Sequence, residues 1–106
     1  MVDIQMALGL DEVKECIRAA VFRLGSSVEI AGKVERDEGL YVLVIEKFYL
    51  RTSSYASLTI VATGDDAASR VTAIASGSGD GLLNLSYGVK KHLEQDFLEE
   101  MESCSW

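Results

Sequence analysis

A run of β-forming residues, LYVLVIEKFYLR from Leu40 to Arg51, constrains the fold of this chain more than any other segment. Val, Ile, Tyr and Phe are enriched in strands, and the run is too dense in them to be a loop. One side of the alternating pattern carries Val42, Val44, Glu46, Phe48 and Leu50, and the other carries Tyr41, Leu43, Ile45 and Tyr49. A strand that is apolar on both sides needs cover on both faces.

Periodicity predicts the elements around this strand. Apolar residues at steps of three and four predict a helix over 10–24, which Gly25 ends, and a last helix from 82 onward. Alternation predicts strands over 2–8, 27–35, 57–63 and 69–76. In the second of these strands, Val28, Ile30 and Val34 fall on one side.

The order of these elements predicts one α+β domain over 1–106 with the two-layer arrangement β-α-β-β-β-β-α. Strands joined by short polar turns pair antiparallel, and two helices with one apolar stripe each cover one face of the sheet. The topology is that of the TATA-binding-protein-like and helix-grip folds. A shared element order carries no function with it.

Charge and hydropathy exclude several classes of partner. Ten Lys and Arg against seventeen Asp and Glu give this acidic chain a net charge of -7, which disfavours binding to nucleic acid and to anionic membranes. No segment reaches the roughly 20 apolar residues of a membrane helix, and the first residues have no signal-peptide pattern. We therefore expect a cytoplasmic protein.

The cysteines and the single histidine give no metal-binding pattern. Cys16 and Cys104 lack metal-ligand spacing, so we expect free thiols in a reducing compartment, with the tail SCSW frayed. His92 is the sole histidine, which excludes a zinc site of several His ligands, and we expect it on the surface. We predict no cofactor.

The glycine-rich stretch ASGSGDGLLNLSYG, residues 75–88, joins the last strand to the last helix. Gly77, Gly79 and Gly81 allow positive φ angles, and the helix that follows would aim amide groups at a bound anion. The stretch lacks the Lys and Ser or Thr of a Walker loop, and Asp80 would repel a phosphate. We favour a tight corner, with a ligand-binding loop that includes Asn84 as the alternative.

The polar segment RTSSYAS, residues 51–57, interrupts the strands, and we interpret it as a turn or bulge. The alternative is that Arg51, Ser53, Ser54 and Tyr55 contact a small ligand. A nucleophilic serine would need a base, and no GxSxG spacing is present. An enzyme is therefore the weakest of our hypotheses.

Glu46 is the charged residue on one side of the long strand. If that side faces the helices, the carboxylate is buried and its pKa is raised unless a cation reaches it. The favoured alternative is a bulge or edge position that exposes Glu46 to water.

The other side of the long strand predicts an interface. Its side chains, together with one from the neighbouring strand, are Tyr41, Leu43, Ile45, Tyr49 and Val61. Because helices cover only one face, we expect homodimerisation through the uncovered face. The competing hypothesis is a helix-grip-like protein that binds a small apolar ligand in a cavity.

Two segments carry a resemblance. SSYASL, residues 53–58, and GSGDGLLN, residues 77–84, followed by Tyr87 and Gly88, resemble a family of small uncharacterised bacterial proteins. The resemblance implies no catalytic or binding residues, because that family has no assigned function.

Overall fold

The computed structural model describes the backbone of residues 1–50, 54–77 and 83–104, with the side chains of 1–50, 55–77 and 90–104. Within these residues, five strands form one antiparallel sheet in the order β1-β5-β4-β3-β2. The elements are β1 (Val2–Met6), α1 (Leu10–Arg23), β2 (Val28–Arg36), β3 (Leu40–Tyr49), β4 (Ser54–Gly64), β5 (Ser69–Gly77) and α2 (Leu83–Cys104). The predicted α+β class and element order are confirmed.

Helix α1 begins and ends where its sequence signals place it. The Glu12 carboxylate accepts a hydrogen bond from the Gly9 amide at 3.4 Å, which satisfies a backbone donor before the first turn. Asp11 and Glu12 in that turn complement the helix dipole. The chain leaves the helix through Leu24 and then Gly25, whose φ of 125° favours glycine.

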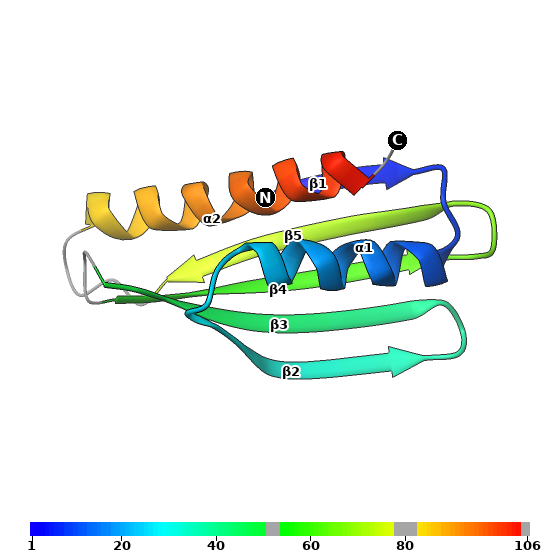
Figure 1. The fold of residues 1–106 in the computed structure, drawn as a ribbon, viewed down its shortest axis with the longest axis horizontal. Coiled ribbons are helices and arrows are strands. Elements are labelled where there is room, and N and C mark those ends of the chain that lie inside the picture. The colour runs from blue at the N-terminus through cyan, green and yellow to red at the C-terminus, as the bar shows by residue number, and fades with distance from the viewer. Residues whose placement is uncertain (51–53, 78–82, 105–106) are drawn as a thin grey trace.

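Both helices lie on one side of the sheet (Figure 1). Helix α2 packs on β5, β4 and β1, whereas α1 packs on β4 and on α2. Strand β2 forms the edge of the sheet opposite β1 (Figure 1), and α1 reaches it through the ion pair between Lys14 and Glu35 at 2.8 Å. The helices therefore cover the part of the sheet formed by β1, β5 and β4 better than the edge formed by β2.

The core fills the space between the sheet and the helices. Its sheet side consists of alternate residues of the central strands, and its helix side of the stripes of α1 and α2. The largest fully buried members are Tyr41, Phe97, Ile17, Leu43, Ile45, Leu58, Ile60, Leu93 and Met101. Burial of such side chains is the main stabilising contribution to the fold, at about 1.5–3 kcal/mol for a fully buried Leu or Ile.

Strand β2 contains a β-bulge that the alternation did not reveal. Ile30 pairs with Ile45 but Gly32 pairs with Val44, so Ala31 is an extra residue. An extra residue moves each side chain that follows it in the strand to the other side of the sheet. The prediction that Val34 shares a side with Ile30 is therefore wrong, since Ile30 lies on the helix side and Val34 on the opposite side.

The predictions for the segment before β4 and for the two cysteines are also wrong. Strand β4 already begins at Ser54, so Ser54, Tyr55 and Ala56 belong to a strand rather than to a turn. The cysteines are not free thiols, because Cys16 and Cys104 form a disulfide with a Cα–Cα distance of 5.8 Å. This bond joins the middle of α1 to the last residue of α2. Because α2 extends to Cys104, residues 103 and 104 of the predicted frayed tail are helical.

Candidate functional site

The side of the sheet without helices, hereafter the open face, carries a continuous set of apolar and hydroxyl side chains. The register aligns Val42 with Val61 and Val61 with Thr72, and it aligns Val44 with Thr59 and Thr59 with Ile74. Val34 extends the first of these rows onto β2. Ile74 and Val34 are 49% and 40% exposed. The centre of the open face therefore consists of β-branched side chains, which suit a flat packing surface.

The predicted facing of the two sides of β3 is wrong. Tyr41, Leu43 and Ile45, predicted as interface, are 1%, 2% and 0% exposed and belong to the core on the helix side of the sheet. Val61 does lie on the open face, but opposite Val42 rather than beside Tyr41.

Glu46 supplies the signal that would have corrected this assignment. It lies on the same side of β3 as Val42, Val44 and Phe48, and it is exposed to water. The favoured alternative, that Glu46 is exposed, is thus confirmed, although the cause is the open face rather than a bulge or an edge. A carboxylate in an otherwise apolar row marks the side that faces water.

Polar groups border the apolar centre of the open face. At one end Glu46 lies opposite Ser57, and the hydroxyls of Ser57 and Ser76 are 2.6 Å apart. Across the sheet, the Arg70 guanidinium donates to both oxygens of Asp3 at 2.8 and 2.7 Å. The hydrogen bond from Arg70 holds the pKa of the Asp3 carboxyl below its ordinary value.

An aromatic pair closes the end of the open face beyond Glu46. Phe48 and Tyr55 are cross-strand partners, and their ring centroids are 5.0 Å apart in a tilted arrangement. Such pairs stabilise neighbouring strands by about 0.5–1.5 kcal/mol beyond their burial. Tyr55 remains 55% exposed, so its ring is also available to a partner.

The predicted ligand-binding residues are only partly placed. Arg51, Ser53, Gly79 and Gly81 lie outside the described residues. Of Ser54 and Asn84 the backbone is described, in β4 and α2. Glu46 and Tyr55 both belong to the open face, whereas Gly77 ends β5 opposite Ala56.

Tyr49, predicted as part of the interface, lies instead on the helix side of the sheet near α2. Burial raises the pKa of its phenol, and the negative charge of Asp96 adds to the shift. Among the described residues, no group makes a hydrogen bond with the buried Tyr49 hydroxyl. Lys47 lies with its ammonium 5.4 Å from the centre of the Tyr49 ring and donates to the Leu24 carbonyl at the end of α1.

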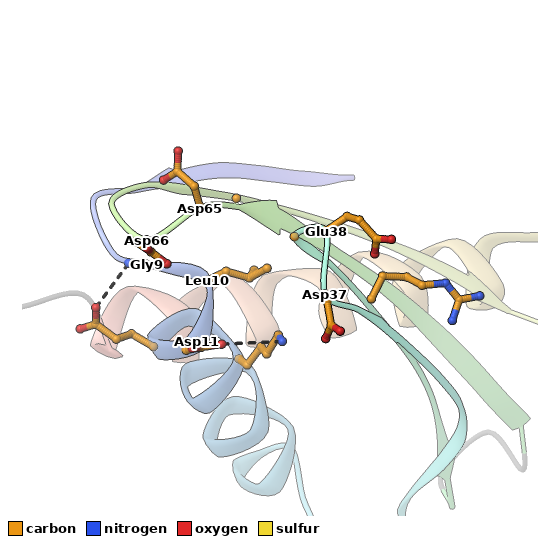
Figure 2. A pocket seen from close by; sticks show the side chains of 12 residues that line it. Gly9, Leu10, Asp11, Asp37, Glu38, Asp65 and Asp66 are labelled. Atoms are coloured by element: carbon orange, nitrogen blue, oxygen red, sulfur yellow. Dashed lines mark hydrogen bonds and ion pairs between the residues drawn. The ribbon is translucent and has the colours of Figure 1, made fainter.

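Three chain connections meet at one end of the sheet and form a depression of about 600 Å³ (Figure 2). The Leu10 amide donates to the Asp65 carbonyl at 2.9 Å, and the Gly64 amide donates to the Gly39 carbonyl at 3.2 Å. The carboxylates that line it, hereafter the acidic rim, are Asp11, Glu12, Asp37, Glu38, Asp65 and Asp66.

The carboxylates of the acidic rim do not converge on one point. Figure 2 shows Asp65 and Glu38 pointing in different directions, and Asp11 pairs with Lys14 at 3.8 Å. Within the described part of the chain, no group of three His, Cys, Asp or Glu residues is arranged to hold a metal ion. The carboxylates of the acidic rim therefore have separate local roles, such as Glu12 at the start of α1 and Asp65 in the turn between β4 and β5, and they form no shared site.

His92 lies on the outer side of α2, as expected for a surface residue. It is paired with Asp96 at 3.2 Å, and its side chain is 66% exposed.

In the described residues, no helix is long and apolar enough to cross a membrane.

The chain belongs to the family of unknown function DUF6054, which matches residues 2–105. This is consistent with the predicted resemblance to a family of uncharacterised proteins. No curated protein and no solved structure matches the sequence.

Proposed function

We propose that this chain is a non-enzymatic α+β module that forms a homodimer by packing two open faces against each other. The observation that carries the proposal is the uncharged centre of that face, formed by Val42, Val44, Thr59, Val61 and Thr72. Sheets that face water on one side normally alternate apolar and polar residues. On β3 both sides are apolar, which calls for a second cover.

The size of the open face suits a dimer. Two of its strands are nine residues long and the sheet has five strands, so with about 3.3 Å per residue and about 4.8 Å between strands the face measures on the order of 600 Å². Two such faces bury on the order of 1,200 Å², which reaches the lower end of stable interfaces.

Charge placement supports the same arrangement. The Asp3–Arg70 pair and Glu46 lie around the apolar centre rather than in it. A polar rim around an apolar centre is typical of protein interfaces.

The test is molar mass by light scattering over a concentration series, for the wild type and for two open-face variants. Val61→Asp and Ile74→Asp each place a charge on the open face, and Ile74 is already half exposed, so that the fold is retained. We expect the wild type to be dimeric and both variants to be monomeric, with unchanged circular dichroism.

The matched control is Ile30→Asp, which places the same charge on the helix side of β2, where Ile30 is 65% exposed. It should leave the dimer intact. A wild type that is monomeric at tens of micromolar would refute the proposal, as would an Ile30→Asp variant that is monomeric while the open-face variants remain dimers.

The cytoplasmic location stays a prediction, and the Cys16–Cys104 disulfide weighs against it. Disulfides persist in oxidising compartments and are rare in the cytosol of most organisms. Alkylation of thiols as the cells are lysed in denaturant distinguishes the two. Unfolding exposes the buried Cys16, so that protein from the cytosol would react at both cysteines.

A further inference from the structure

A second surface feature lies on the helix side of the sheet, away from the open face. Because the helices pack on β1, β4 and β5, an apolar groove of about 590 Å³ remains between α1 and β2. We call it the α1–β2 groove, and its lining consists of Arg18, Val21, Phe22, Gly25, Ser26, Val28, Ile30, Lys33, Tyr41 and Leu43.

The groove has a buried floor and exposed apolar walls. Tyr41 and Leu43 form its floor and are 1% and 2% exposed. Phe22 on α1 and Ile30 on β2 form opposite walls and are 85% and 65% exposed. Large apolar side chains exposed on both sides of a concave apolar surface mark a binding groove rather than scattered surface residues.

The charges of the groove have one sign. Arg18 and Lys33 line it, and no carboxylate does so among the described residues, although the chain carries a net charge of -7. The partners of these cations, Glu15 and Glu35, lie outside the lining. Lys33 is 3.9 Å from Glu35, and exposed ion pairs of this kind contribute only about 0–1 kcal/mol. Arg18 and Lys33 can therefore exchange these partners for a ligand anion at little cost.

We propose that the α1–β2 groove binds a long-chain fatty carboxylate. The acyl chain would lie between the exposed side chains of Phe22 and Ile30, above the buried Tyr41 and Leu43. The carboxylate would accept hydrogen bonds from Arg18 or Lys33. A volume of about 590 Å³ falls in the range of small-molecule sites. A second copy fits this surface less well, because the bulge at Ala31 and the charges of β2 discourage pairing of that edge. This inference does not depend on the open-face dimer.

The first experiment compares three probes with the same alkyl chain by calorimetric titration, below the critical micelle concentrations of the two ions and below the solubility of the alcohol. Decanoate carries the anion, decan-1-ol is neutral, and decyltrimethylammonium carries a cation. We expect decanoate to bind about tenfold more tightly than decan-1-ol, the gain of one charge-assisted hydrogen bond, and the cation to bind weakest. Equal binding of the three probes would overturn the proposal.

The second experiment locates the site. Phe22→Ser and the double variant Arg18→Gln with Lys33→Gln should each weaken decanoate binding by about tenfold, and the double variant should also abolish the preference for decanoate over decan-1-ol. The matched controls are Leu50→Ser, just after β3, and Lys91→Gln on α2, both exposed and outside the groove. Unchanged binding in the groove variants would overturn the proposal. A molar mass that falls in Phe22→Ser would also overturn it, because it would assign the groove to a second copy.

Discussion

The side chain of Glu94 on α2 takes the place of a strand partner for Ala75 on β5. Its Oε2 accepts the Ala75 amide at 2.9 Å, at a point beyond the last pair between β1 and β5, which joins Val2 to Ala73. Its Oε1 accepts the N-terminal ammonium at 2.8 Å. One carboxylate thus connects the last helix, the inner strand β5 and the start of the chain.

The first prediction concerns the pH dependence of this contact. Burial pushes the pKa of Glu94 up, but the Ala75 amide and the ammonium outweigh it, so that the pKa lies below its ordinary value. A depressed pKa stabilises the fold above the ordinary pKa, and this contribution is lost as pH falls through the folded-state pKa. Glu94→Gln should lower the free energy of unfolding by about 1–2 kcal/mol at neutral pH and by less in acid.

Denaturant unfolding at a series of pH values measures this effect. Glu99→Gln is the control, because Glu99 is an exposed glutamate on the same helix. A difference between wild type and Glu94→Gln that stays constant from neutral to acidic pH would contradict the role assigned to the carboxylate.

The second prediction contrasts two glycines. Gly39 has a φ of 91°, and a methyl group there would meet the Gly64 carbonyl oxygen. Gly39→Ala should therefore destabilise the protein by about 1–3 kcal/mol. Gly32 has nothing within 4 Å of the corresponding position, so Gly32→Ala should be neutral or stabilise by up to about 1 kcal/mol. Gly39→Ala should lower the melting temperature, and Gly32→Ala should leave it unchanged or raise it. Equal losses would refute this account.

The sequence predicts best those elements that many residues indicate together. The predicted bounds of helix α1 agree with the observed ones within one residue, because its apolar stripe, the acidic first turn and Gly25 all indicate the same helix. The pattern does not predict the open face, since period two shows which residues share a side but not which side meets the helices. Tyr41 and Val42 are equally apolar in pattern, and only Glu46 distinguishes their sides.

The remaining features have no local sequence signal. The bulge at Ala31 is one extra residue in a strand that otherwise alternates. The α1–β2 groove exists because of where α1 packs, which depends on contacts between distant segments. Its exposed wall residue Phe22 lies off the apolar stripe of α1, and this misplacement was the one hint available from the sequence.

The third prediction concerns the turn between β4 and β5. One Asp65 oxygen accepts the amides of Ala67 and Ala68 at 2.8 and 3.0 Å, and these bonds hold the pKa of Asp65 below its ordinary value. Asp65→Ala should lower the melting temperature at neutral pH, and Asp65→Asn should lower it less because an oxygen acceptor remains. The wild-type advantage should fade as pH falls through the depressed pKa. An Asp65→Asn variant less stable than Asp65→Ala would contradict the turn's dependence on the acceptor.

The last prediction concerns the disulfide between Cys16 and Cys104, which are 88 residues apart in sequence. A bond that closes so long a loop restricts the unfolded chain, and removing it typically costs about 2–5 kcal/mol. Reduction with dithiothreitol should lower the melting temperature and free the last turn of α2, which is measured by amide hydrogen exchange.

The control for the reductant is Cys16→Ala combined with Cys104→Ala. This variant should melt near the reduced wild type, and dithiothreitol should not change it further. Alkylation of the unreduced protein should also leave its mass unchanged, because neither sulfur is a thiol. Two alkylated cysteines in protein purified without reductant would contradict the disulfide, and α1 and α2 would then be held together by their buried faces alone.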